Sequence, residues 1–117
     1  MNNTGQIGED LAGQYLLKNG YTILEQNLKA PFGEIDIIAE KKNCICFIEV
    51  KSRKSNKYGL PEEAITPIKK KRIIKVAQLY IKKKHIKNKL FRFDVISIKF
   101  DRYLLTEIRH ITNAFIQ

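Results

Sequence analysis

The 117-residue chain is predicted to form an α/β fold with its elements in the order α, β, β, β, α, β, β. Two segments, 4–19 and 66–84, carry apolar side chains at helical spacing. Five others are rich in Ile, Val and Phe between turn residues, which is typical of strands. With 44% hydrophobic and 29% charged residues, the composition is that of a globular protein, and we expect residues 1–117 to form a single domain.

The first helix is predicted from an apolar arc over residues 4–19, which Gly20 ends as a C-terminal cap. Gly8 and Ala12 lie in the middle of this arc, and such small residues let a helix lie close against a sheet. Glu9 falls at the edge of the arc. Its carboxylate is therefore either a solvated boundary group or a functional one.

The remaining elements are read from strand-forming runs and from one helix start. Thr66 and Pro67 predict the beginning of the second helix, with Thr as N-cap and Pro at the first helical position. The expected strands span 21–28, 34–40, 44–53, 91–100 and 104–111.

The second and third strands can be folded on paper as an antiparallel hairpin. A turn at Lys42-Asn43 pairs residues whose numbers sum to 85, so Asp36 faces Glu49 and Glu34 faces Lys51. A slip of one residue would mix charged side chains into both faces, so this register is preferred. It places a wholly apolar set on one face: Ile35, Ile37, Ala39, Cys44, Cys46, Ile48 and Val50.

The facing carboxylates of Asp36 and Glu49 point to metal chemistry. Two carboxylates about 5 Å apart on a sheet repel each other, and a proton, a basic neighbour such as Lys51 or a divalent cation can offset the repulsion. Mg²⁺ or Mn²⁺ takes one or two carboxylates together with waters and phosphate oxygens, and the carbonyl of Val50 can add a ligand. We therefore expect metal-dependent hydrolysis of phosphodiesters, with Asp36, Glu49 and Val50 as metal ligands.

Lys51 lies two residues after Glu49 and projects to the same side of the strand. Beside two carboxylates it is expected to stay protonated, and so to orient water and stabilise the transition state rather than act as a general base. The alternative is structural, because Glu-x-Lys on a strand is also a common salt-bridging pattern.

Basic residues concentrate in one part of the chain. The net charge is +10, and residues 51–92 hold fifteen basic and two acidic side chains. Lys71, Lys75 and Lys82 gather on one flank of the second helix, which favours a polyanion, most simply nucleic acid, bound in a salt-sensitive way. The alternatives are a solvated lysine face, a general surface for acidic partners, or a non-catalytic nucleic-acid binding or accessory protein.

Other features limit the function classes. No apolar run approaches the length of a membrane span and the first residues lack the pattern of a signal peptide, so we expect a cytoplasmic protein without membrane contact. Cys44 and Cys46 lack the spacing of a zinc site and are expected in the core, and His110 has no companion ligand. Asp94, two residues after Arg92, is either in a buried ion pair or supports the site residues from behind, and the buried ion pair is favoured.

Several of these segments resemble the YraN family of bacterial proteins over nearly the whole chain. The resemblance is carried by Gly8-Glu9, Gly33-Glu34-Ile35-Asp36, Phe47-Ile48-Glu49-Val50-Lys51-Ser52-Arg53 and Arg92-Phe93-Asp94-Val95. That family is described as predicted endonucleases similar to archaeal Holliday junction resolvases. The resemblance implies a restriction-endonuclease-like αβββαβ core, a mixed sheet flanked by helices, and a PD-(D/E)xK site for branched or structured DNA.

Carried over by position, Asp36 would be the aspartate of the motif, and Glu49 and Lys51 its (D/E)xK. Glu9 would be the first-helix acid of resolvase-like members. Ile35 stands where the motif has proline. The resemblance also implies contacts with the phosphate backbone by Ser52 and Arg53, and an approach of Lys71 to nucleic acid. Since one site cuts one strand, a homodimer is expected where both strands are cut.

Overall fold

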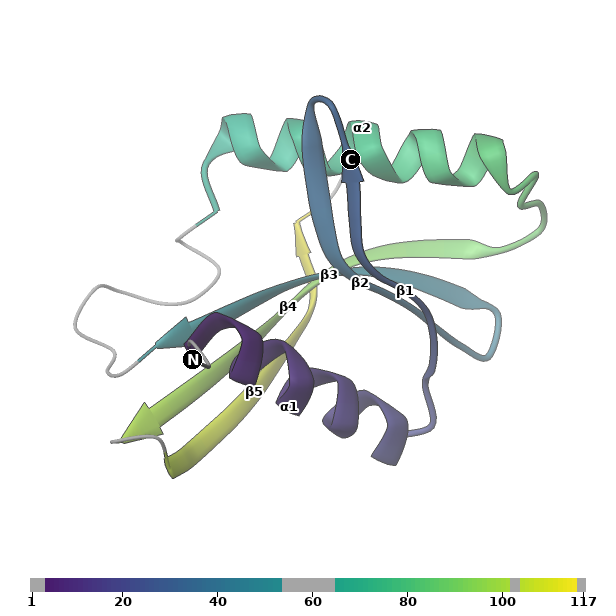
Figure 1. Cartoon of the computed structure of the whole chain (residues 1–117). Coiled ribbons are helices and arrows are strands. Elements are labelled where there is room, and N and C mark those ends of the chain that lie inside the picture. The colour runs from purple at the N-terminus through teal and green to yellow at the C-terminus, as the bar shows by residue number, and fades with distance from the viewer. Residues whose placement is uncertain (1–3, 54–64, 102–103, 116–117) are drawn as a thin grey trace.

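The computed structural model describes residues 4–53, 65–101 and 104–115, which form two helices and five strands (Figure 1). The predicted order of elements is confirmed, and the differences lie at element ends, such as the last strand, which runs to Phe115. The helices are α1 (Thr4–Lys18) and α2 (Pro67–Lys83); the strands are β1 (Thr22–Ala30), β2 (Gly33–Lys41), β3 (Cys44–Arg53), β4 (Leu90–Asp101) and β5 (Leu104–Phe115).

The strands form one mixed sheet in the order β1-β2-β3-β4-β5. β3 and β4 are parallel, and the other neighbours are antiparallel. Parallel neighbours cannot be joined by a tight turn, and α2 lies in the crossover between them. This mixed sheet flanked by helices is the predicted fold class and is consistent with a restriction-endonuclease-like core.

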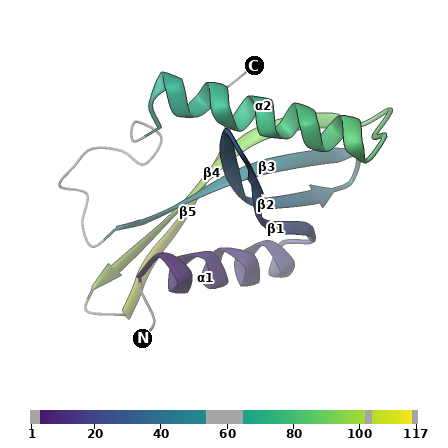
Figure 2. The same ribbon diagram turned by 45° about the horizontal axis from the view of Figure 1, so that its top comes forward.

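The two helices cover opposite faces of the sheet (Figures 1 and 2). Ala12 and Leu16 of α1 pack on an apolar face that includes Cys46 and Ile48. The face under α2 is filled by a second buried cluster, which includes Ile38, Phe47, Ile73, Val76, Tyr80 and Phe93. Each helix therefore buries its apolar side against the sheet, which accounts for the helical spacing in the sequence.

The start of α2 follows the predicted capping pattern. The Thr66 hydroxyl accepts a hydrogen bond from the main-chain N–H of Lys69 at 3.1 Å, and Pro67 occupies the first helical position. This cap fixes where α2 begins, and it therefore places Lys69 in the first turn of the helix.

The predicted register of β2 and β3 is confirmed where the two strands pair. The pairs run from Lys41 with Cys44 to Ile37 with Ile48, and the ladder ends there. β2 stays paired to β1 as far as its first residue. The end of the β1–β2 hairpin therefore leaves β3 and rises toward α2 (Figure 1).

Two backbone features accompany this departure. Asn27, which lies between the ladder pairs Gln26–Ile37 and Leu28–Ile35, has a φ of 52°, in the left-handed region that Asn tolerates better than most residues. A Cβ added to Gly33 would lie 3.1 Å from Cβ of Arg72, so the hairpin end packs tightly on α2. The hairpin is thus bent at Asp36 and held against the helix at its tip.

The bend makes two sequence predictions wrong. Glu34 does not pair with Lys51, because the ladder of β2 with β3 ends at Ile37 and Ile48. Ile35 was expected on the same face as Ile37 and Val50, but it packs in the cluster under α2, whereas they pack in the cluster with α1. The strict alternation of faces holds only for a strand that continues straight, and β2 turns at Asp36.

None of the helices in the described ranges is both long and apolar enough to cross a membrane.

Candidate active site

The candidate site lies where β2 separates from β3. The main-chain N–H of Val50 donates a 2.8 Å hydrogen bond to Oδ2 of Asp36, so a side chain replaces the strand ladder at this point. In an extended strand the N–H and C=O of one residue point to the same side. The carbonyl of Val50 therefore also faces the gap that β2 has left.

Glu49 supplies the second carboxylate from β3. Its side chain is only 8% exposed, and its Oε1 lies 2.8 Å from Nζ of Lys69 and 3.9 Å from Nζ of Lys51. The negative charge of Glu49 acts on the carboxylate of Asp36 across the gap. The predicted convergence of the two acids is thus present in the structure, and Lys51 and Lys69 complete a group of four charges.

Asp36 is strained electrostatically. Burial and the neighbouring Glu49 carboxylate raise its pKa to about 7, and the hydrogen bond from Val50 offsets only part of this effect. Ionised Asp36 therefore costs free energy in the protein alone. A cation in the gap would remove that cost, because it favours the charged form of both acids.

Glu9 approaches the same gap from α1. A Cβ on Gly8 would lie 1.9 Å from Oγ of Ser52, which confirms the predicted close approach of this helix to the sheet. Burial, with the charges of Glu34, Asp10 and Glu49, raises the pKa of Glu9. Its Oε1 is buried and has no hydrogen-bond partner in the described part of the chain.

Asp36 and Glu49 form a pair of carboxylates with Glu9 as an acidic neighbour, and the three do not form a cage around one metal position. Within 4–53, 65–101 and 104–115, no three His, Cys, Asp or Glu side chains are grouped closely enough to hold a metal ion. The ligands on offer are the two carboxylates of Asp36 and Glu49 and the carbonyl of Val50. All are hard oxygen donors, and together with waters they fit Mg²⁺ or Mn²⁺, which rarely uses an all-protein cage.

The two acidic neighbours of Lys51 favour its charged form as expected, but they do not set the direction in which its pKa is displaced. The pKa of Lys51 is lowered, first by burial and then by the adjacent ammonium group of Lys69, and these effects exceed the attraction of Glu49 and Asp36. Lys69, in contrast, has a raised pKa: burial opposes its charge, but hydrogen bonds to Glu49 and Lys51 outweigh that effect.

Lys69 is the residue of this site that the sequence reasoning missed. A signal was present, because the first turn of α2 contains no acidic residue and Lys69, Lys70 and Lys71 follow one another there. Positive charges are unfavourable at the positive end of the helix dipole. Such a run at a helix start indicates that an anion lies nearby, and for Lys69 that anion is Glu49.

The predicted nucleic-acid residues lie on α2 and at the end of β3. Lys71, Lys75 and Lys82 are exposed on α2, Arg53 is half-buried at the end of β3, and the hydroxyl of Ser52 lies under α1 beside Gly8. Their contact with nucleic acid stays a prediction.

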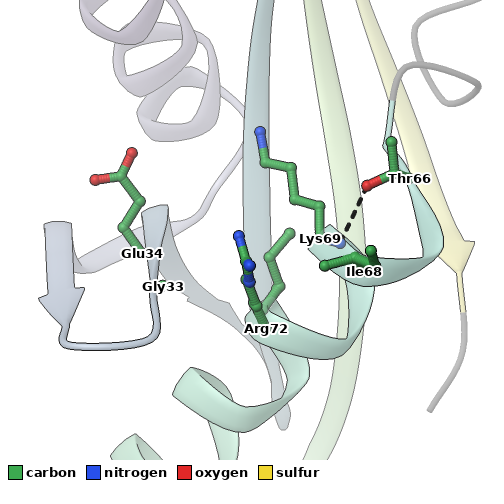
Figure 3. Close-up of a pocket in the computed structure, with 7 residues that line it drawn as sticks. Gly33, Glu34, Thr66, Ile68, Lys69 and Arg72 are labelled. Atoms are coloured by element: carbon green, nitrogen blue, oxygen red, sulfur yellow. Dashed lines mark hydrogen bonds between the residues drawn. The ribbon is translucent and has the colours of Figure 1, made fainter.

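A pocket of about 320 Å³ opens between the end of the β1–β2 hairpin and the first turns of α2 (Figure 3). Figure 3 shows Glu34 on the hairpin side and Lys69 and Arg72 on the helix side. The lining residues are Gly33, Glu34, Thr66, Ile68, Lys69, Arg72 and Ile73. The pocket therefore adjoins the carboxylate pair through Lys69.

Asp94 lies apart from the candidate site, in a network that its own neighbours satisfy. It is fully buried and accepts hydrogen bonds from the Arg92 guanidinium at 2.9 Å, from the N–H of Asn113 at 3.1 Å and from Nε2 of His110 at 2.7 Å. Nδ1 of His110 lies 3.2 Å from the Tyr15 hydroxyl. The predicted buried ion pair is confirmed.

Comparison with known proteins gives consistent relatives over most of the chain. The model of the uncharacterised protein family UPF0102 matches residues 8–98, which include all the acids and lysines of the candidate site. A UPF0102 protein of Caldanaerobacter subterraneus subsp. tengcongensis is 47% identical over 113 residues, covering 95% of this chain and 93% of that protein. One of Persephonella marina is 50% identical over 111 residues (95% and 91%), and one of Dictyoglomus thermophilum is 44% identical over 118 (98% and 100%).

Proposed function

The chain belongs to the uncharacterised protein family UPF0102, which is the YraN family, and we propose that this member is a metal-dependent nuclease that hydrolyses phosphodiester bonds of branched or structured DNA. The observation that carries the proposal is the opening of the sheet at Asp36. There the ladder with β3 ends, and Asp36, Glu49 and Lys51 face one gap beside a basic helix.

The carboxylates of Asp36 and Glu49 and the carbonyl of Val50 would hold Mg²⁺ or Mn²⁺. The buried Glu9 oxygen without a hydrogen-bond partner and the raised pKa of Asp36 support this assignment, because both indicate negative charge that the protein alone leaves uncompensated. When bound, the ion supplies activation of water and neutralisation of the charge that develops on the phosphate.

Lys51 and Glu9 act on the attacking water and the phosphate in this proposal. The Lys51 ammonium, close to Glu49, donates hydrogen bonds to the water and to a non-bridging phosphate oxygen. Glu9 holds a water at the α1 side of the gap through its buried oxygen.

The exposed lysines of α2 would bind the DNA backbone. Lys71, Lys75 and Lys82 lie along the helix whose first turn reaches the site, so a duplex along α2 brings a phosphate toward the gap. Such contacts position the DNA without reading its sequence. A branched substrate would therefore be recognised by the shape of its backbone rather than by its bases. A twofold dimer would present two such sites and so cut both strands.

The proposal is tested with the purified full chain, Mg²⁺ and labelled four-way-junction, flap and linear duplex substrates. We expect cleavage of a branched substrate that stops when EDTA is added, and a loss of at least about 100-fold in Lys51→Ala and Asp36→Asn. The matched control is Lys18→Ala, at the exposed end of α1 away from the site.

No cleavage of any substrate, or equal cleavage by the wild type and Lys51→Ala, would reject the proposal. Steeply salt-dependent binding without cleavage, unchanged in Asp36→Asn and indifferent to metal, would instead identify a non-catalytic nucleic-acid binding protein.

A further inference from the structure

The carboxylate of Glu49 already forms an ion pair with the ammonium group of Lys69. Nζ of Lys69 lies 2.8 Å from Oε1, while Lys51 lies 3.9 Å from the same oxygen. The Glu49 side chain is 8% exposed and that of Lys69 is 39% exposed, so the carboxylate side of the ion pair is desolvated and the ammonium side reaches solvent. The carboxylate oxygen that the proposed function assigns to a metal is therefore neutralised by a side chain of the protein itself.

The position of Lys69 on α2 does not by itself favour its charge. It lies in the first turn, where the helix dipole disfavours cations, and Lys70 and Lys71 add further positive charge. Lys70 lies instead over the ring of Phe115, 5.7 Å from its centroid. The ion pair with Glu49 is thus the main interaction that holds the ammonium group of Lys69 in the gap.

The side chain of Lys69 borders an open pocket into which its ammonium group can move. Its side chain is 39% exposed and lines the pocket of about 320 Å³ between the hairpin end and α2 (Figure 3). Arg72 lines the same pocket and forms no ion pair or hydrogen bond with any other residue that the structure describes. An ammonium group that leaves Glu49 would therefore stand beside a second cation, an arrangement that suits a phosphate.

We propose that Lys69 is a resident counterion of Glu49 that a divalent cation displaces, and that the released ammonium group binds a backbone phosphate of the substrate beside Arg72. The inference rests on the proposed function and adds a control to it. One buried carboxylate oxygen cannot hold both cations closely, because they repel each other at short range.

Metal and DNA binding then strengthen each other. A phosphate that draws Lys69 away frees Glu49 for the metal, and a metal that displaces Lys69 frees it for the phosphate. By linkage the two effects are equal in size. Lys69 keeps the free protein a weak metal binder and assembles the site on substrate.

The inference is tested by Mn²⁺ binding to the full chain without DNA, followed by the loss of the free Mn²⁺ signal in electron paramagnetic resonance. We expect Lys69→Gln to bind Mn²⁺ about 10-fold more tightly than the wild type, within the range of typical coupling. Lys70→Gln removes the same charge one residue away and should change affinity less than about 2-fold. Lys69→Arg keeps the charge and should bind as weakly as the wild type.

The outcomes separate the inference from the proposed function. Equal affinities for the wild type and Lys69→Gln would overturn the displacement by metal and leave the nuclease proposal standing. No Mn²⁺ binding to any of these proteins would overturn both. Tighter binding by Lys69→Gln that disappears in Lys69→Gln with Glu49→Gln would support the inference, since it assigns the gain to this carboxylate.

A second arm tests the phosphate contact with a phosphorothioate-substituted junction in place of a cleavable one. We expect the junction to increase Mn²⁺ affinity more in the wild type than in Lys69→Gln, because only the wild type has an ammonium group to remove. The same increase in both would overturn the assignment of Lys69 to the phosphate.

Discussion

Asp36 and Asp94 are both largely buried aspartates of one sheet, yet their partners differ. Asp94 receives hydrogen bonds from Arg92, His110 and Asn113, and no part of it is exposed. Asp36 receives a 2.8 Å hydrogen bond from Val50 and lies near the like charges of Glu49 and Glu9, which the ammonium group of Lys69 offsets only in part. The protein thus supplies a full set of hydrogen-bond donors to Asp94, whereas it gives Asp36 one main-chain donor and leaves its negative charge poorly compensated.

The pKa values record this difference. Burial alone would raise both, but hydrogen bonds from His110, Arg92 and Asn113 lower the pKa of Asp94 below its usual value of 3.8. For Asp36, burial and Glu49 prevail and raise the pKa to about 7. Burial is therefore a poor sign of function, whereas an incomplete set of partners is a good one.

The largest effect is expected from Asp94→Ala. This change leaves the Arg92 guanidinium and the His110 ring without their acceptor inside the protein, so the free energy of unfolding should fall by about 3–5 kcal/mol. The measurement is urea unfolding followed by circular dichroism. Asp10→Ala, at an exposed position of α1, is the control and should change stability by less than about 0.5 kcal/mol.

A small effect of Asp94→Ala would contradict the comparison, because it would mean that the network of Asp94 contributes no more than a surface contact.

Asp36→Asn should act in the opposite direction. The amide oxygen can still accept the hydrogen bond from Val50, while the charge that Glu49 repels is gone. At pH 8 and without metal, we expect the free energy of unfolding to rise by about 2 kcal/mol, a gain typical of replaced functional residues. Thermal melting in EDTA checks this, with Asp36→Ala as a control that loses the hydrogen bond.

The pH dependence of that gain provides its sharper form. The pKa of Asp36 is about 7 in the folded protein, against a model value of 3.8. The folded state therefore holds a proton that the unfolded state releases, and wild-type stability contributed by this group falls as the pH rises from about 4 to about 7. The advantage of Asp36→Asn should accordingly vanish below about pH 4. An advantage that is equal at pH 4 and pH 8 would contradict the assigned cause.

A smaller effect is expected at the bend that keeps Asp36 out of the ladder. Asn27 has a φ of 52°, which costs Ala about 1 kcal/mol relative to Asn or Gly. Asn27→Ala should lower the free energy of unfolding by about that amount, and Asn27→Gly should leave it nearly unchanged. Chemical unfolding of the three proteins in parallel decides this; equal losses in Ala and Gly variants would assign the effect to the side chain instead of the bend.

Much of the fold could be predicted because it depends on local patterns. The turn at Lys42-Asn43 and the alternation of apolar residues determined the register of β2 and β3, and Thr66-Pro67 marked the start of α2. The pair of Asp36 and Glu49 followed from that register. Its surroundings did not, because β2 bends at Asp36, and Ile35 changes face as a result.

Lys69 could not be placed for a different physical reason. Its contact with Glu49 joins residues 20 positions apart across a chain crossover, and no periodicity in either element encodes it. The pKa of Lys51 is lowered first by its burial and then by Lys69, and neither effect can be read from the Glu-x-Lys spacing, so the sequence alone gave the wrong direction. The lysine run at the start of α2 signals an anion but does not say which one.

The most direct test that Asp36 and Glu49 bind a divalent cation is a Mg²⁺ titration of the full ¹⁵N-labelled chain, observed by nuclear magnetic resonance. The reporter is the main-chain amide of Val50, which donates its hydrogen bond to Asp36. We predict saturable shifts centred on Asp36, Glu49 and Val50 in the wild type, with stronger binding in Lys69→Gln and none in Asp36→Asn. Shifts that are absent from these residues in both the wild type and Lys69→Gln, or that persist unchanged in Asp36→Asn, would contradict the account.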